Sequence, residues 1–168
     1  MNTSASLARD FAWYARHIAL GELYQSYAHC LDSGDLTAWP GFFTDDGIYR
    51  AQGRENYDRG LPLAAIACEG QGMLLDRVNV ILNVMVYAPR YIQHVVAQPQ
   101  VVSENGSELL ARASFSVFHT LPHEPTALLS VGRYEDTLAV MADGTWKFKQ
   151  RLAIYDTLLI PGSLVYPL

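Results

Sequence analysis

Four long segments in the second half of the chain alternate apolar and polar side chains, and this pattern constrains the fold more than any other feature. They cover residues 91–103, 108–121, 127–141 and 145–160. From Leu109 to Val117 every second residue is apolar, which is typical of a strand with one buried face. Asn105-Gly106 and Asp143-Gly144 favour tight hairpins, and the proline-flanked stretch 121–125 favours a wider turn. The pattern predicts an antiparallel meander.

Apolar residues in the first third of the chain recur at helical spacing instead. The first stripe consists of Leu7, Phe11, Tyr14 and Ile18, and a second stripe continues beyond Gly21 to Leu31. We expect two helices or one kinked helix here. A further helix is expected from Gly72, because Leu74, Val78 and Ile81 share one face.

Short strands at residues 48–52 and 63–68 complete a sheet of about six strands. A short helix is expected after Asp35, and the polar stretch 53–60 is expected to be a loop. Helices first and a curved antiparallel sheet afterwards is the segregated α+β arrangement, in which the sheet wraps over the helices. A length of 168 residues suits one domain, residues 1–168, with residues 1–20 as an N-terminal helical extension.

The last strand and the residues after it carry the next prediction. Trp146, Phe148, Leu152 and Ile154 fall on one parity, which we expect to face the inside of the sheet. Arg151 falls on the other parity, so Arg133, Glu135 and Arg151 are expected to form charge pairs on the outer face. After Asp156 the sequence has no charged side chain, and we expect residues 161–168 to pack on a neighbouring surface.

Composition narrows the function classes. Half of the residues are hydrophobic and 17% are charged, which suits either a large core or apolar surface covered by a partner. The net charge is −5 and no lysine–arginine run occurs, so nucleic acid and anionic membranes are excluded as expected partners. Two isolated cysteines and the absence of a secretory or membrane-spanning segment favour a cytoplasmic protein.

Several local strings, taken in order, resemble a known family. They are Trp39-Pro-Gly-Phe-Phe-Thr-Asp-Asp-Gly-Ile-Tyr49, Gly72-Met-Leu-Leu-Asp-Arg-Val78, Gly132-Arg-Tyr-Glu-Asp136 and Arg151-Leu-Ala-Ile-Tyr-Asp156. Together they resemble the small (β) subunit of Rieske-type aromatic-ring-hydroxylating dioxygenases, from about Gly21 to the end of the sequence. The resemblance implies a cystatin-like, nuclear-transport-factor-type cone.

The resemblance also implies a partner. In that family a large (α) subunit carries a Rieske [2Fe-2S] cluster and a mononuclear non-haem iron, which dihydroxylate an arene, while the small subunit is mainly structural. It implies three large plus three small chains, with self-trimer contacts between the small ones. The stretch Tyr87-Ala-Pro-Arg-Tyr-Ile-Gln-His94 is similar to members that act on aromatic carboxylates such as terephthalate. The expected interface residues are Asp76, Arg77, Arg133, Leu164, Val165, Tyr166 and Leu168.

This chain does not carry ligand sets for those cofactors. A Rieske centre needs paired Cys-x-His and Cys-x-x-His spacings, and neither Cys30 nor Cys68 is followed by histidine. An iron site of the facial-triad type needs two histidines and a carboxylate. His119, His123 and Glu124 are the nearest such set, and we interpret them as a solvated loop group. We therefore expect neither cofactor nor metal in this chain.

Two alternative functions stay open. Cones of this type also serve as ketosteroid-isomerase-like or dehydratase-like enzymes, with a tyrosine and an acidic or histidine side chain in the cone. Candidate residues for such a site are Tyr24, Tyr27, Tyr49, His94 and Asp136. The ordinary interpretation of the tyrosines is core packing with satisfied hydroxyls. A binding-only pocket protein of the same fold is the other alternative.

Overall fold

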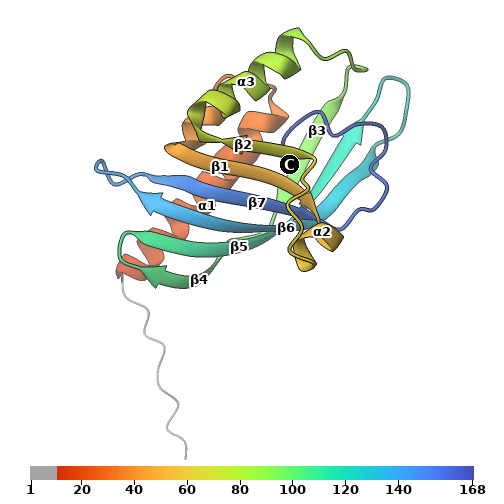
Figure 1. Cartoon of the computed structure of the whole chain (residues 1–168). Helices are drawn as coiled ribbons and strands as arrows, with labels where there is room; N and C mark the ends of the chain where they lie inside the picture. Colours follow the sequence, from red (N-terminus) through yellow and green to blue (C-terminus); the bar gives the residue numbers. More distant parts are fainter. Residues whose placement is uncertain (1–10) are drawn as a thin grey trace, which may run out of the picture.

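A curved sheet forms the body of the chain over residues 11–168, which are the residues that the computed structural model describes. Its strands are β1 (Phe43–Gly53), β2 (Ile66–Glu69), β3 (Tyr91–Val96), β4 (Gln100–Asn105), β5 (Glu108–Thr120), β6 (Ala127–Val140) and β7 (Trp146–Tyr155). They are hydrogen-bonded in the order β2-β1-β7-β6-β5-β3, and β4 also pairs with β5. The sheet therefore has β2 at one edge and β3 with β4 at the other (Figure 1).

Two long helices, α1 (Phe11–Asp32) and α3 (Gly70–Asn83), share one core with the sheet. α1 contacts β3 and β7, whereas α3 contacts β1 and β2. Figure 1 accordingly shows α1 crossing the sheet and α3 near its β2 edge. The predicted α+β class is confirmed, with helices packed in a curved sheet.

The sheet differs from the expected one in two details. It has seven strands within residues 11–168 rather than about six, because the stretch expected as one strand is divided into β3 and β4 around Pro99. Proline lacks the N–H that a continuous ladder needs. The sheet is also mixed, because β1 runs parallel to β7 while the other neighbours are antiparallel.

Of the two alternatives for the N-terminal stripes, two helices or one, the described residues form a single helix. α1 continues through the boundary expected at residue 20, and it buries Leu20, Tyr24 and Tyr27 at helical spacing. The same helix leaves Phe11 86% exposed, and Tyr14 and Ile18 are exposed beside it. Leu7 lies outside the described residues.

The short elements between α1 and α3 also differ from expectation. The turn of helix after Asp35 is reduced to a 3-10 helix, η1 (Trp39–Phe42), with Pro40 in its first turn. The stretch expected as a polar loop contains a helix of one turn, α2 (Arg54–Asp58). Among residues 11–168, no helix combines the length and apolar character needed to cross a membrane.

A β-bulge in β7 overturns the predicted parity of that strand. Gln150 pairs with Thr137 and Phe148 pairs with Leu138, so Lys149 is an extra residue. Because side chains alternate between faces, one extra residue exchanges the faces of all that follow. Arg151 is consequently fully buried, and the prediction that it lies on the outer face is wrong.

Residues 163–168, here called the tail segment, pack on their own chain. Val165 and Leu168 are buried in the common core, and Leu164 and Tyr166 are half-buried against it. Arg77 Nη2 from α3 donates to the carbonyl oxygens of Leu164 and Val165, at 3.2 and 2.6 Å. This differs from the expected packing on a neighbouring surface, because Val165 and Leu168 have almost no surface left for a partner.

Gly132, on β6, has no room for a side chain between β5 and β7. It pairs with Phe115 on one side and Tyr155 on the other. An added Cβ would lie 2.1 Å from the Ile154 carbonyl oxygen and 2.8 Å from the Tyr155 Cα. Both neighbours are backbone atoms that cannot move without disturbing the ladder, so only glycine fits.

We predict that Gly132→Ala lowers the free energy of unfolding by about 2 kcal/mol or more, because the new methyl group collides with backbone. Urea denaturation followed by circular dichroism measures this loss. Gly72→Ala is the matched control, since an added Cβ at this position in α3 meets nothing within 4 Å. The control should leave stability unchanged or raise it by up to about 1 kcal/mol. Equal stability of the two variants would contradict the conclusion that only glycine fits at position 132.

Candidate functional site at the centre of the cone

An ion pair between β6 and β7 occupies the centre of the cone. Asp136 and Arg151 are directly opposite each other in the ladder. Arg151 Nε donates to Asp136 Oδ1 at 3.2 Å and Arg151 Nη2 donates to Oδ2 at 2.8 Å, and both side chains are fully buried. The hydroxyl of Tyr24, from α1, donates to Oδ2 as well. The carboxylate therefore has a bidentate cationic partner and a third donor.

Aromatic rings enclose the guanidinium of Arg151. Its Cζ lies 3.8 Å from the ring centre of Phe148 and 4.1 Å from those of Tyr27 and Tyr134. Such contacts between a cation and a ring face strengthen when water is excluded. The arginine therefore fills the interior as an apolar side chain would, while its charge is neutralised by Asp136.

Burial and the ion pair shift the pKa values of this group in different directions. Burial raises the pKa of Tyr24 well above its ordinary value, and the charge of Asp136 adds to the effect. Burial raises the pKa of Asp136, which the contacts from Arg151 and Tyr24 oppose. Burial would lower the pKa of Arg151, but Asp136 and the nearby tyrosines more than offset this and raise it. The guanidinium therefore stays charged.

Tyr49, on β1, points to the tail segment rather than to Asp136. The Leu168 N–H donates to the Tyr49 hydroxyl at 2.7 Å. The hydroxyls of Tyr49 and Tyr27 both donate to the main-chain oxygen of Leu168, each at 3.3 Å. The two tyrosines thus hold the end of the tail segment inside the cone.

His94, on β3, belongs to a separate pair. Its Nδ1 lies 2.6 Å from Asp32 Oδ1 at the end of α1, and its backbone N–H donates to the same carboxylate. This pair joins the last turn of α1 to the sheet, which is a structural task. Of the residues proposed for an isomerase-like site, the structure brings together Tyr24 and Asp136 but places His94 and Tyr49 elsewhere. Asp136 has no exposed oxygen with which to act as a base.

The cysteines and histidines do not fit the cofactors of the family that the sequence resembles. The Cys30 thiol donates to a backbone carbonyl, and burial raises its pKa to about 11, which disfavours the thiolate that a cluster needs. His119 is buried in β5 whereas His123 and Glu124 are exposed, so the interpretation as one solvated loop group was wrong for His119. Among residues 11–168, no group of three or more His, Cys, Asp or Glu side chains could hold a metal.

The outer face of the sheet carries the charge pairs predicted for Arg133 and Glu135. Arg133 Nε donates to Glu135 Oε1 at 3.0 Å, and the Tyr57 hydroxyl from α2 donates to Oε2 at 2.7 Å. Arg77 faces its own tail segment, whereas Asp76, the next residue on α3, is exposed. The two neighbours therefore have different surroundings, as expected for adjacent helix positions.

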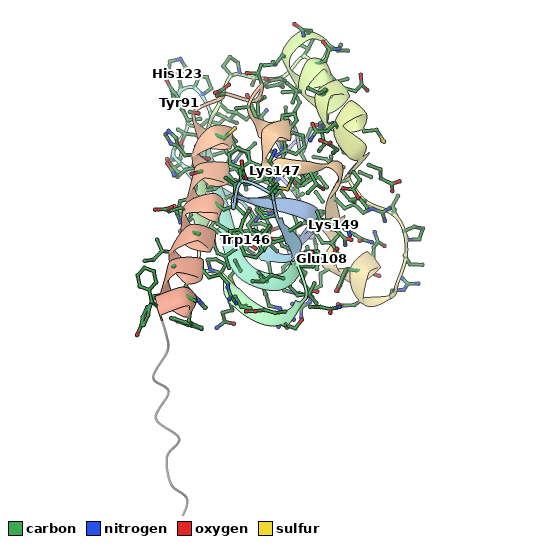
Figure 2. The ribbon with its side chains drawn as sticks, turned by 90° about the vertical axis from the view of Figure 1, so that its left-hand side faces the viewer. Tyr91, Glu108, His123, Trp146, Lys147 and Lys149 are labelled. Atoms are coloured by element: carbon green, nitrogen blue, oxygen red, sulfur yellow. The ribbon has the colours of Figure 1, made fainter. Side chains whose placement is uncertain are left out.

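Two hollows on the surface leave the side chains of the central ion pair unexposed. One of about 520 Å³ is lined by residues 89–91 and 120–124. Figure 2 shows its Tyr91 and His123 together at one end of the molecule, apart from Glu108 and Lys149. A smaller hollow of about 220 Å³ lies over β5, β6 and β7, and its lining includes Arg112, Glu135 and Asp136, although the Asp136 side chain itself is 0% exposed. Neither hollow brings an acid and a base together with Asp136 accessible.

Three important residues escaped the sequence reasoning. Arg151 was assigned to the wrong face, although the adjacent polar residues Lys149 and Gln150 interrupt the alternation and signal a bulge. Gln71 donates to the carbonyl oxygens of Pro40, Phe43 and Thr44, at 3.0 to 3.2 Å. The contacts of Gln71, and the pairing of Asp32 with His94, could not be predicted from nearby sequence, because each joins segments that are far apart in the chain.

We predict that Asp136→Asn lowers the free energy of unfolding by about 3 to 5 kcal/mol, because it leaves the Arg151 charge buried without a counter-charge. Tyr24→Phe should cost about 1.5 to 3 kcal/mol by removing one hydrogen bond to the carboxylate. Urea denaturation measures both. Glu108→Gln is the control, because its pair with Lys149 is exposed (Figure 2) and should contribute less than about 1 kcal/mol. A larger loss of stability for Glu108→Gln than for Asp136→Asn or Tyr24→Phe would contradict the prediction.

Comparison with known proteins agrees with this geometry. Residues 16–152 match the SnoaL-like domain family. The chain is 30% identical to the anthranilate 1,2-dioxygenase small subunit of Burkholderia cepacia, over 87% of this chain and 90% of that protein. It is 26% identical to the terephthalate 1,2-dioxygenase terminal oxygenase component subunit beta 2 of a Comamonas species, over 90% of this chain and 97% of that protein.

A solved structure gives the same result in three dimensions. The β subunit of a candidate aromatic-ring-hydroxylating dioxygenase from Novosphingobium aromaticivorans is 32% identical and superposes with a TM-score of 0.85. The match covers 94% of this chain and 99% of that one. With its cone fold and its similarity over most of its length, the chain belongs to the SnoaL-like domain family and, within that fold, to the small (β) subunits of aromatic-ring-hydroxylating dioxygenases.

Proposed function

We propose that this chain is a structural, non-catalytic β subunit of a cytoplasmic dioxygenase, and that it holds the large subunits in a closed ring. The observation that carries the proposal is the similarity to the anthranilate dioxygenase small subunit over most of both chains. The central contacts support it, because both oxygens of Asp136 are bound by Arg151 and the site is closed to water. A chain of this kind contributes surfaces rather than reacting groups.

The chemistry then belongs to the partner. The large subunit would carry the Rieske [2Fe-2S] cluster and the mononuclear iron, and the assembly would contain three large plus three small chains with contacts among the small ones. The relatives named for anthranilate and terephthalate dioxygenases support an aromatic carboxylate as the substrate of the assembly. Substrate choice would reside in the large subunit.

The outer side of α3 is the surface that we propose for the partner. Leu75 and Leu82 are about half exposed there, and Asp76 is exposed between them. Exposed leucines on one helix side are costly in water and favour burial against another protein. Leu164 and Tyr166 of the tail segment are half-buried and stay in the proposed interface, as does Arg133 on the sheet.

We predict that the chain purified alone is colourless and turns over no substrate, whereas co-expression with its neighbouring Rieske-containing reading frame yields a brown complex. Iron–sulfur absorbance in the co-purified fraction measures this, and sedimentation gives the stoichiometry. Turnover of a cyclic ketone or alcohol by the chain alone would refute the proposal and support an isomerase-like or dehydratase-like enzyme. Ligand-dependent melting without any partner would instead support a binding-only protein.

A second prediction addresses the surface. The double variant Leu75→Asp and Leu82→Asp should reduce co-purification of the large subunit at least tenfold, because it places charges in an apolar interface. The melting temperature of the isolated chain should change little, since both side chains are exposed. Leu63→Asp, at an exposed position in the segment before β2, is the matched control. Undiminished co-purification of the double variant would exclude this side of α3 as the interface.

A further inference from the structure

The hollow lined by residues 89–91 and 120–124 lies where β3 begins and where the turn from β5 to β6 is found. Figure 2 shows its Tyr91 and His123 together at one end of the molecule. Its volume of about 520 Å³ falls within the range of about 300 to 1,000 Å³ that is usual for clefts that bind small molecules. The structural role proposed above makes no use of this hollow.

Arg90 gives one wall of the hollow a positive charge that lacks a counter-ion. The side chain is half-buried, and it forms no ion pair with the described residues, whereas the other described arginines pair with carboxylates or, for Arg77, bind the tail segment. Its Nε donates to the Ala88 carbonyl oxygen at 3.2 Å, and its Cζ lies 5.7 Å from the ring centre of Tyr87. These contacts hold the guanidinium in place. A fixed guanidinium without a counter-ion is suited to binding an anion.

The rest of the hollow offers flat apolar surface. Tyr91 is 83% exposed although its ring is large and apolar. Pro89 and Pro122 line the hollow beside it, and Leu121 contributes a half-buried aliphatic side chain. An aromatic ring placed against Tyr91 would remove this apolar surface from water and gain a ring–ring contact. The walls therefore suit an anion that carries an aromatic ring.

The turn that carries His123 has a fixed conformation. The Glu124 N–H donates to the Leu121 carbonyl oxygen at 3.1 Å, and the hydroxyl oxygens of Thr120 and Thr126 are 2.9 Å apart. His123 has a φ of 66°, and it is the one non-glycine residue with positive φ in the described part of the chain. Such a conformation is costly and is found preferentially at ligand sites. It places beside the hollow an imidazole that has an N–H donor in either protonation state.

Glu124 limits which anion can bind. Its side chain is exposed and lines the same hollow, so its carboxylate repels a ligand of the same sign. A phosphate ester carries about two negative charges at neutral pH and is repelled more strongly than a carboxylate, which carries one. A carboxylate also matches the guanidinium geometry with two parallel hydrogen bonds.

We propose that this hollow is a binding site for a small aromatic monocarboxylate. Arg90 binds the carboxylate, His123 adds a hydrogen-bond donor, and Tyr91 contacts the ring together with the two prolines. The site is formed by this chain alone and does not depend on the structural role proposed above. A binding-only protein would also bind such a ligand, but it would not co-purify with a large subunit.

The test uses the full chain, labelled with ¹⁵N, and benzoate as the probe at pH 7. In a titration followed by NMR, the amide signals of Tyr91 and His123 should shift to saturation while those of β1 stay constant. Benzamide lacks the charge and acetate lacks the ring, and each should bind at least fivefold more weakly than benzoate. Phenyl phosphate should also bind more weakly, because Glu124 opposes its second charge. Equal binding of benzamide, or tighter binding of phenyl phosphate, would overturn the proposed ligand class.

Two variants with opposite expected effects identify the binding group. Arg90→Gln should weaken benzoate binding at least fivefold and leave benzamide binding unchanged, because it removes the charge. Glu124→Gln should tighten benzoate binding at least twofold, because it removes the repulsion. Arg59→Gln is the matched control, since Arg59 is exposed and pairs with Glu55 outside the hollow, and it should bind benzoate as the unaltered chain does. Unchanged benzoate affinity of Arg90→Gln would overturn the site.

A measurement on the complex separates a free ligand from a carboxylate side chain of the partner. Arg90→Gln should co-purify with the large subunit as well as the unaltered chain does. If the partner's carboxylate occupies the hollow instead, Arg90→Gln will reduce co-purification at least fivefold and the isolated chain will not bind benzoate. That pair of results would overturn the proposal.

Discussion

The ion pair of Arg151 with Asp136 is the interaction on which the interior of this protein depends. An arginine in a water-free interior needs a counter-charge, and Asp136 supplies it from the facing strand while accepting hydrogen bonds from Nε and Nη2 of Arg151. The rings of Phe148, Tyr27 and Tyr134 then pack directly on the guanidinium. The pair thereby fills the region where an enzyme of this shape would need an accessible acid or base.

The placement of Arg151 requires irregular backbone in two neighbouring strands. The extra residue Lys149 turns Arg151 inward, and between Phe43 and Ile48 the parallel strand β1 makes a larger detour opposite the same bulge. At Gly47 an added Cβ would lie 2.7 Å from the Cβ of Phe43, so that detour needs glycine. The side chain of Gln71 donates to three carbonyl oxygens in and beside the detour. It thereby gives a hydrogen-bond partner to backbone groups that lie outside the regular ladder.

The sequence predicted the parts of the fold that depend on local periodicity. The α+β class, the meander from β5 to β7 and the helix at Gly70–Asn83 follow from apolar spacing and turn residues. The face of Arg151 could not be obtained in this way, because one unpaired residue reverses the alternation. The parallel pairing of β1 with β7 and the contact of Leu168 with Tyr49 in the same chain also escaped, since both join segments more than a hundred residues apart. For the candidate site, the sequence analysis selected both Tyr24 and Asp136, and the structure places them in contact. It did not predict that Arg151 would bind and bury Asp136.

The tail segment shows why a run of uncharged residues does not by itself identify an interface. Its many hydrophobic residues correctly indicated that it is buried. Composition alone does not distinguish burial within the chain from burial against a partner. The distinction comes from the hydroxyls of Tyr27 and Tyr49, which give the backbone of Leu168 specific partners inside the cone. The leucines on the outer side of α3 have no comparable shelter within residues 11–168. An interior filled by the chain's own side chains and tail segment, together with exposed leucines on α3, supports the proposed role of a subunit that acts through its surface.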